Sequence, residues 1–408
     1  MPVTAGKRAT VTLSDRSIVD PYGGPGGWSE GLRTLGLTDV GIEWDAAACA
    51  TRAAAGHRTI RADVATFPLD HLVGRVDGAI LSPPCQAFST AGTGEGRDVV
   101  PELAAAIRRG DWRWSHTDDR VRHVLEVGRW AETLRPRWVA CEQVPPVLPL
   151  WQAYADRWRA LYGWSVWCGI LNAADYGVPQ TRRRAFLIAR TDGQPVAPPA
   201  PTHTEGGALT MFGELKPWVS LVEALGWDED VELHHIRGAG MTERHGDRPG
   251  RPATEPAPTI EGGSYRRMAV LRTNQDSQIR KGVTKRYERT VDRPAPTPTQ
   301  MGRSWVWDQP ATTVAGDPRI TARCHHDAGS QGANAVTVEQ AMTGDYDGKA
   351  PIKLTIRDAL ILQGFDPDYP VQGTRTAQFR QIGDAVPPPL AAAVIAAVTG
   401  TSAARRAA

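Results

Sequence analysis

The sequence predicts an α/β fold: a doubly wound, mostly parallel sheet interrupted by an irregular, β-rich insert. Three observations support this prediction. Short apolar runs alternate with helical segments from Arg16 to Ala189, which is typical of a parallel sheet. The stretch from about Glu232 to Ala350 has little helical periodicity and is rich in Gly, Pro, Thr and Arg. Regular helical spacing returns between Thr355 and Val398.

The expected strands are short apolar segments, each followed by a turn or a helix. A Gly-rich turn, Tyr22–Gly27, follows the first strand, and an Ala-rich helix follows the second. In chain order the expected strands are Arg16–Asp20, Val40–Trp44, His57–Ala62, Asp77–Leu81, Arg137–Cys141, Trp164–Ile170 and Ala185–Ala189.

The expected helices are segments whose apolar residues recur at helical spacing. Asp119–Leu134 is amphipathic, and Pro389–Val398 is almost entirely apolar. The others are Trp28–Leu35, Ala46–Ala55, Lys216–Trp227 and Thr355–Leu362. The Pro-rich stretch from Thr191 to Gly207 predicts a linker. We therefore expect three parts: residues 1–217, an insert over residues 218–350, and a return to the first part over residues 351–408.

The composition is ordinary for a soluble globular protein: 408 residues, 41% of them hydrophobic and 23% charged. No run of about 18 apolar residues is present, so no transmembrane helix is expected. Met1–Ser14 is polar and lacks the apolar core of a secretory signal. The five cysteines are scattered without CxxC spacing, which argues against a disulfide framework and against a zinc site. We expect a cytoplasmic protein that binds neither a membrane nor a metal.

Positive charge is concentrated in the insert. The formal net charge of the chain is only +2, but Arg237–Arg323 holds 16 Lys/Arg and nine Asp/Glu. A basic segment on a mildly acidic body suits contact with nucleic-acid phosphates. On charge alone, a solvated Arg-rich loop region explains the pattern equally well.

Cys85 lies directly after an expected strand, in the segment Ser82-Pro83-Pro84-Cys85-Gln86. The two prolines fix the backbone and place the thiol at the carboxyl edge of the sheet, where open α/β sheets bind ligands. A thiol at this edge can serve as a nucleophile if a neighbouring cation favours the thiolate. A buried structural cysteine is the alternative, and the residue alone does not decide between them.

Six motifs, in the same order, resemble those of the DNA (cytosine-5)-methyltransferase family. The first to stand out is Pro84-Cys85-Gln86-x-Phe88-Ser89, which resembles the family's nucleophile motif. The others are Asp20-Pro-Tyr22-Gly-Gly24-Pro-Gly26-Gly27, Glu142-Gln143-Val144, Gln180-Thr-Arg182-Arg-Arg184, Arg357-Asp358 with Leu362-Gln363-Gly364-Phe365, and Gln381-Ile-Gly-Asp384-Ala-Val-Pro-Pro388. They extend from Asp20 to Val398, except for the basic insert. The resemblance implies a Rossmann-like, S-adenosylmethionine-dependent methyltransferase fold.

The resemblance also implies the chemistry. C5 of cytosine is a poor nucleophile, and addition of a thiolate at C6 makes C5 enamine-like. Cys85 is then the nucleophile, and Glu142 contacts N3 and the exocyclic amine, where negative charge develops. Arg182 and Arg184 lie at the pocket, one of them toward the cytosine O2. The base that removes the C5 proton is not identified.

The cofactor implied is S-adenosyl-L-methionine. A Gly-rich loop between a strand and a helix suits it, although nicotinamide enzymes use the same geometry. The resemblance places Tyr22 and Trp44 against the adenine, Asp63 near its amino group, and Glu43 on the ribose. Other cofactor contacts implied by the motifs are Gly24, Gly26, Gly27, Pro84, Asp384 and Ala385.

Double-stranded DNA is the implied substrate, because the basic insert occupies the place of the family's target-recognition domain. Residues 1–217 and 351–408 then form the catalytic and cofactor domain. Ala87–Thr117 is expected to be the loop that closes over a flipped base. Candidate DNA contacts are Gln86, Ser89, Arg97, Arg266, Arg267, Lys285, Arg286 and Arg303. We expect a monomer; a cognate restriction endonuclease acting separately would be a natural partner.

The chain departs from the family pattern at four positions. Tyr22 replaces Phe, Gln143 replaces Asn, Asp358 replaces Glu and Asp384 replaces Asn. Gln143 can shift the active-site loop, and Asp384 adds a negative charge that could pair with a cation or favour an altered cofactor. The alternatives are the same chemistry on RNA, transfer of a modified group, or an inactive DNA-binding relative. The last is disfavoured by the presence of both Cys85 and Glu142.

Overall fold

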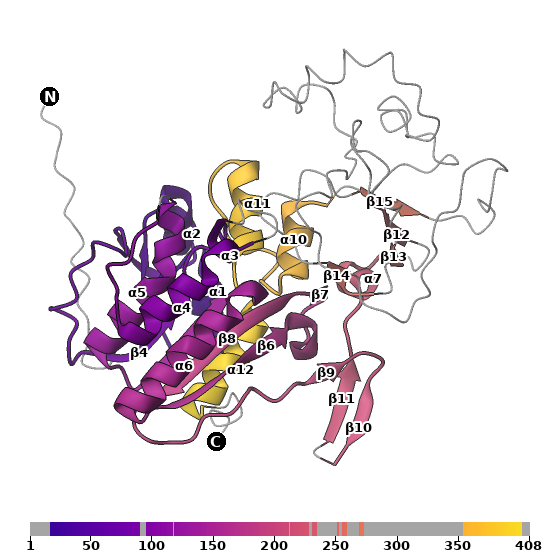
Figure 1. Ribbon diagram of the computed structural model, residues 1–408. Helices are drawn as coiled ribbons and strands as arrows, with labels where there is room; N and C mark the ends of the chain where they lie inside the picture. The colour runs from indigo at the N-terminus through magenta and orange to yellow at the C-terminus, as the bar shows by residue number, and fades with distance from the viewer. Residues whose placement is uncertain are drawn as a thin grey trace, which may run out of the picture. The chain divides into compact units, whose positions relative to one another are not determined.

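The computed structural model describes residues 17–89, 95–116, 118–211, 213–227, 231–234, 251–252, 255–258, 269–272 and 354–401. These fall into two compact units, which we describe separately. The first comprises residues 1–172, 183–201 and 369–408, and the second comprises residues 173–182 and 202–368. Figure 1 labels many of the elements of both.

The first unit is built on a seven-stranded sheet in the order β3-β2-β1-β4-β5-β8-β6. All neighbouring strands are parallel except at β8, which is antiparallel to both β5 and β6. The strands are β1 (Ser17–Pro21), β2 (Asp39–Glu43), β3 (Arg58–Arg61), β4 (Val76–Leu81), β5 (Trp138–Gln143), β6 (Ser165–Asn172) and β8 (Arg183–Arg190). The seven expected strands are therefore all present, with ends shifted by at most two residues.

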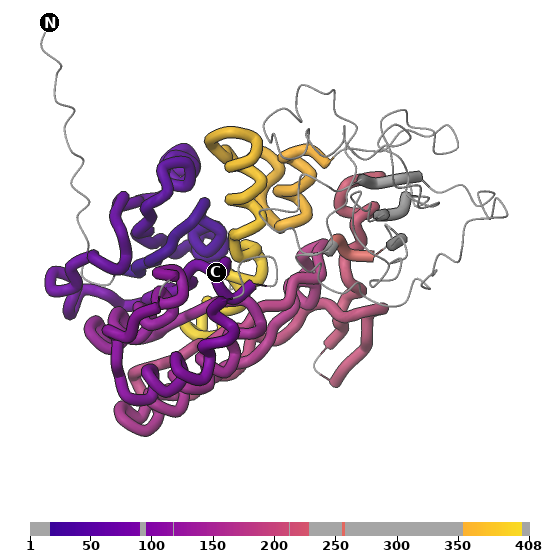
Figure 2. Tube along the Cα trace, turned by 45° about the horizontal axis from the view of Figure 1, so that its top comes forward, coloured from indigo at the N-terminus to yellow at the C-terminus, as the bar shows by residue number. Residues whose placement is uncertain are grey.

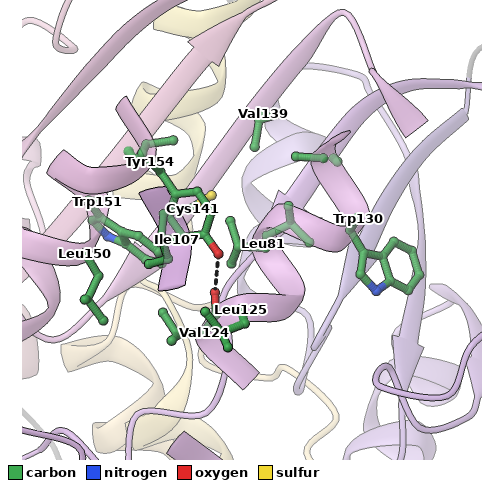
Figure 3. Packing of buried hydrophobic residues seen from close by; sticks show 14 of the residues in the cluster. Leu81, Ile107, Val124, Leu125, Trp130, Val139, Cys141, Leu150, Trp151 and Tyr154 are labelled. Atoms are coloured by element: carbon green, nitrogen blue, oxygen red, sulfur yellow. Dashed lines mark hydrogen bonds between the residues drawn. The ribbon is translucent and has the colours of Figure 1, made fainter. Parts of the chain in front are cut away.

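Both faces of this sheet are covered. β1, β2 and β5 are buried along their whole length, as expected when helices cover a parallel sheet on each side. On one side, Val139 and Cys141 of β5 point to a cluster that includes Leu150, Trp151 and Tyr154 (Figure 3). The hydroxyl of Tyr154 donates to the Val124 carbonyl at 2.9 Å within this core.

The helices on that side are α4 (Val100–Arg109), α5 (Asp119–Leu134) and α6 (Leu148–Tyr162), with α4 packed against α5 and α6. A short helix, α3 (Glu95–Asp98), precedes α4. The remaining helices are α1 (Gly27–Thr34), α2 (Ala46–Ala54), α11 (Arg375–Asp384) and α12 (Pro388–Thr399). α5 has the expected bounds, and Asp118 caps its start by accepting from the Arg120 amide.

The end of the chain returns to its beginning, because α12 packs against α1 (Figure 2). The contact is close: a Cβ on Gly27 would lie 2.2 Å from the Val386 carbonyl oxygen, and one on Gly31 would lie 2.7 Å from the Ala391 Cβ. By length and composition alone, Arg375–Thr399 is apolar enough to span a membrane, with a mean hydropathy of 1.5 over 18 residues. That window is 61% buried, and the packing of α12 on α1 and the sheet accounts for its apolar character.

The second unit contains short strands and turns. A hairpin of β10 (Ala208–Thr210) and β11 (Gly213–Pro217) pairs with β9 (His203–Thr204), and β7 (Gln180–Thr181) pairs with β14 (Ala257–Pro258). A further sheet joins β12 (Val231–His234) to β13 (Arg251–Pro252) and β15 (Ala269–Arg272). Its helices include α7 (Leu221–Leu225) and α10 (Ile356–Leu362), which contact each other.

Two expectations about secondary structure are wrong. The helix expected over Lys216–Trp227 is only Leu221–Leu225, because Lys216 lies in β11 and the Ser220 side chain caps the helix start. The expected loop Ala87–Thr117 contains α3 and α4. The Leu103, Ala106 and Ile107 side chains of α4 are buried in the core, so this part of the segment is an integral helix.

Candidate active site

Cys85 lies in a turn that begins directly after β4. Its carbonyl accepts from the amides of Phe88 at 3.0 Å and Ser89 at 2.8 Å, which folds the chain back on itself. The Trp28 indole donates to the Ser82 hydroxyl at 2.9 Å on the other side of the prolines. Cys85 is half-buried, whereas Cys141 in the core is fully buried, and that burial raises the pKa of the Cys141 thiol. Of these two thiols, Cys85 is the one placed to meet a ligand.

Gln143, at the end of β5, holds the Cys85 turn in place. Its Nε2 donates to the carbonyl oxygens of Pro83 at 2.8 Å and Pro84 at 3.1 Å. Its Oε1 accepts from the Val144 amide at 2.7 Å. Gln143 is fully buried, so each of these bonds satisfies a group that water does not reach. The longer side chain at this position thus supports the loop.

Glu142 pairs with Arg184 across neighbouring strands. The strand expected to end at Cys141 continues to Gln143, because β8 pairs with it antiparallel and places Phe186 opposite Glu142. Arg184, two residues from Phe186, shares a sheet face with Glu142. Its Nε lies 3.2 Å from Glu142 Oε1, and both residues are 7% exposed. The carboxylate is therefore held by a buried cation.

Arg182 belongs to the second unit. It is 2% exposed, and its carbonyl accepts from the Ala173 amide at 2.9 Å. In the same unit, Gln180 Nε2 donates to Gln363 Oε1 at 2.8 Å, which joins two of the predicted motifs. Thr355 and Asp358 form a capping box at the start of α10, which shows that Asp serves there as well as the usual Glu.

The loop after β1 is anchored by Glu43, the last residue of β2. Glu43 Oε2 accepts from the Gly24 amide at 2.8 Å, and its Oε1 accepts from the Trp44 and Asp45 amides at 2.8 Å each. Gly24 and Gly26 have φ values of 50° and 104°, which glycine adopts at low cost. Gly26 also lacks room for a side chain, because a Cβ would lie 2.8 Å from the Tyr369 hydroxyl.

The other predicted cofactor residues lie in the first unit. Trp44 is 74% exposed, and Asp63 is exposed with its Oδ1 accepting from the Ala65 amide at 2.9 Å. Pro84 is half-buried beside Cys85. Asp384 is the exposed last residue of α11, and the buried Ala385 is its C-cap.

Few of the predicted DNA contacts lie in the part of the chain that the structure describes. Gln86 and Ser89 are half-buried in the Cys85 turn, and Arg97 is exposed on α3. Arg266, Arg267, Lys285, Arg286 and Arg303 lie outside the described residues.

Sequence reasoning missed a buried charge network beneath the loop that follows β1. Arg52 donates to the Gly23 carbonyl at 3.0 Å and to Asp39 Oδ2 at 2.8 Å, and it lies 3.7 Å from Asp20. Burial, together with the nearby Asp39, raises the pKa of Asp20 well above its usual range, and Arg52 opposes this. In an Ala-rich helix, Arg52 looks like a surface residue, so the sequence carries no signal for it.

A model of the family "C-5 cytosine-specific DNA methylase" matches residues 17–109 and 118–400. The chain belongs to this family. It is a DNA (cytosine-5)-methyltransferase, and methyltransferases of this kind generally use S-adenosylmethionine and act on DNA. The predicted family and the predicted fold class are both confirmed.

Relatives in the cytosine-5 methylase family align over nearly the whole chain. The Type II methyltransferase M1.HphI of Haemophilus parahaemolyticus is 27% identical, over 94% of this chain and 86% of its own. The Type II methyltransferase M.AgeI of Thalassovita gelatinovora is 26% identical, over 92% of this chain and 97% of its own. The crystal structure of the S. pombe Dnmt2 methyltransferase matches with a TM-score of 0.53 at 13% identity, over 94% of this chain and 98% of that one, and supports the fold alone.

Proposed function

We propose that this DNA methyltransferase modifies C5 of a cytosine in double-stranded DNA through a covalent bond between Cys85 Sγ and C6 of the base. The observation that supports this most directly is the set of hydrogen bonds that joins the end of β5 to the turn after β4. Gln143 bonds the turn that carries Cys85 to the strand that carries Glu142. The proposed nucleophile follows β4 and the proposed acid lies on β5, and these two strands are parallel neighbours.

The protein groups have separate roles in the reaction. The Cys85 thiolate adds at C6, which pushes an electron pair toward C5 and N3 and makes C5 nucleophilic. Glu142 contacts N3 and neutralises the charge that develops there. Arg184 orients the Glu142 carboxylate through the ion pair at 3.2 Å. After C5 is methylated, loss of its proton restores the aromatic ring and expels the Cys85 thiolate.

The residues around the β1–α1 loop fit S-adenosylmethionine, which supplies an electrophilic methyl group when bound. Glu43 Oε2 accepts one bond, from Gly24, and so has a lone pair left for a ribose hydroxyl. The exposed Trp44 ring offers a stacking surface that no core contact requires. We assign Tyr22 and Trp44 to the adenine, Asp63 to its amino group and Glu43 to the ribose. Gly24, Gly26, Gly27, Pro84, Asp384 and Ala385 line the rest of the site.

The insert, residues 218–350, is proposed to recognise the DNA sequence, and Arg182 to line the base pocket. Chemistry on a paired base requires that it leave the stack, at a cost of a few kcal/mol, and the charge of +7 over Arg237–Arg323 suits the phosphates. We further propose a cytoplasmic monomer that protects sites from a separately acting restriction endonuclease. The Type II names of the relatives support this role.

Covalent trapping tests the nucleophile. Incubation with S-adenosylmethionine and duplex DNA containing 5-fluorocytosine should give an adduct that survives denaturation, because fluorine at C5 cannot leave as a proton does. Cys85→Ser should abolish the adduct. The control is Cys168→Ser, which changes a half-buried thiol on β6 and should leave the adduct intact.

Labelled S-adenosylmethionine tests the substrate. Label should enter duplex DNA, and bisulfite sequencing of DNA from expressing cells should identify the modified site. Label in tRNA with none in DNA would overturn the assignment of the substrate.

A further inference from the structure

Tyr22 and His123 join two elements that are 101 residues apart in sequence. The Tyr22 hydroxyl lies 2.9 Å from Nδ1 of His123, which is in the second turn of α5. The two rings meet edge to face, with centroids 5.6 Å apart and planes at 88°. Both side chains are half-buried in the first unit.

The backbone of Tyr22 is strained, which makes this side-chain contact informative. Its φ is 75°, a left-handed conformation that a bulky residue rarely adopts. The Tyr22 amide donates to the Ile42 carbonyl at 3.0 Å, which holds the main chain in that conformation. The bond to His123 then fixes the far end of the ring, so both ends of Tyr22 are tied to the fold.

Tyr22 and His123 are both expected to be uncharged in the folded protein. Burial raises the pKa of Tyr22 well above its usual range, so the phenol keeps its proton. Burial also lowers the pKa of His123, which favours the neutral imidazole; Asp63 and Asp119 oppose this, and Arg122 adds to it. Two neutral groups can share this hydrogen bond in either direction, because the neutral imidazole accepts or donates at Nδ1 according to its tautomer.

We propose that His123 is a positioning residue of the cofactor site, which sets the Tyr22 ring at the angle needed to pack against adenine. This rests on the proposed function, in which Tyr22 contacts the adenine of S-adenosylmethionine. The hydroxyl that distinguishes Tyr22 from the usual Phe then gives the ring an anchor on α5. His123 acts through Tyr22 and takes no part in the chemical step.

Calorimetric titration of the full chain with S-adenosylhomocysteine, without DNA, tests the inference. One hydrogen bond contributes about 0.5–1.5 kcal/mol, so Tyr22→Phe and His123→Leu should each weaken binding by roughly two- to tenfold. The double variant should bind as weakly as either single variant, because one bond is lost in all three. His123→Asn, which keeps an acceptor near Nδ1, should recover part of the affinity.

The kinetic signature is a higher KM for S-adenosylmethionine with an unchanged kcat at saturation. Tyr162→Phe is the matched control, because it removes a hydroxyl bonded to Glu132 at 2.9 Å in the same unit and should leave the affinity unchanged. Additive losses of affinity in the double variant, or no loss of affinity in Tyr22→Phe, would overturn the role of His123. Neither result would contradict the proposed cofactor pocket. Failure of the wild type to bind would overturn the cofactor pocket itself, and the inference with it.

Discussion

The side-chain amide of Gln143 donates to the Pro83 carbonyl oxygen at 2.8 Å. Gln143 directly follows Glu142 in the chain, and Pro83 lies two residues before Cys85. The proposed acid and nucleophile are therefore coupled through a single buried side chain. An Asn at this position would be one methylene shorter. The Gln found here reaches two carbonyls of the Cys85 turn and still accepts from the Val144 amide.

Gln143→Glu should destabilise the protein by about 3 kcal/mol, because it replaces a buried donor by a carboxylate that faces two carbonyl oxygens. The rate of adduct formation on 5-fluorocytosine DNA should fall as well, since the Cys85 turn loses its anchor. Urea denaturation and trapping measure the two effects. Gln194→Glu, on the exposed surface, is the control and should change neither. Wild-type stability in Gln143→Glu would contradict the anchoring role.

Arg184→Met should lower the free energy of unfolding by about 3–5 kcal/mol, because it leaves the buried Glu142 carboxylate without its ion-pair partner. Glu142→Gln should slow methyl transfer by roughly 100-fold or more. In the double variant, stability should largely recover while activity does not, which separates the structural role from the chemical one. Arg120→Met, which breaks a partly exposed pair with Asp118, should cost less than about 1 kcal/mol.

Trp44→Ala should leave stability unchanged within about 0.5 kcal/mol, because the side chain is 74% exposed. Its affinity for S-adenosylhomocysteine should nevertheless fall roughly tenfold through lost stacking. Leu161→Ala, at an apolar residue of α6 that is 57% exposed, serves as the control. Equal affinity in Trp44→Ala and the wild type would remove Trp44 from the cofactor site.

Asp20 should make the protein less stable as pH rises. Its pKa is raised in the folded state, so the folded protein holds this proton more tightly than the unfolded chain does. The stabilisation is complete below the ordinary Asp value of about 4 and is lost as pH rises through the raised value. Asp20→Asn should therefore gain stability relative to the wild type over that range, as measured by urea midpoints at a series of pH values.

Asp192 provides a control of opposite sign. The hydrogen bond from Arg190 lowers the pKa of Asp192 to about 2. The stabilisation that ionised Asp192 gives the folded state is present above about pH 4, and it is lost as the pH falls toward the lowered pKa of about 2. Asp192→Asn should thus differ from the wild type above pH 4 and converge with it in acid. The same slope for Asp20→Asn and Asp192→Asn would refute the assignment for Asp20.

Features set by local pattern could be predicted from the sequence, and those set by distant contacts could not. Asp119–Leu134 has the bounds that its amphipathic spacing predicts. The helix Val100–Arg109 was missed within an expected loop, since its burial depends on packing against Leu148–Tyr162. His123 and Arg52 are ordinary helix residues by sequence. Only the folded chain brings them to Tyr22 and Gly23.

The contact between α1 and α12 has a consequence for how the protein is made on the ribosome. The helix that follows the cofactor loop emerges early, whereas the helix it packs against through Gly27 and Gly31 is translated late. A nascent chain that stops before Pro388 lacks the helix that packs against α1. The pocket proposed at the β1–α1 loop is therefore expected to form only after α12 has been translated, so a chain cut before Pro388 should not bind S-adenosylmethionine.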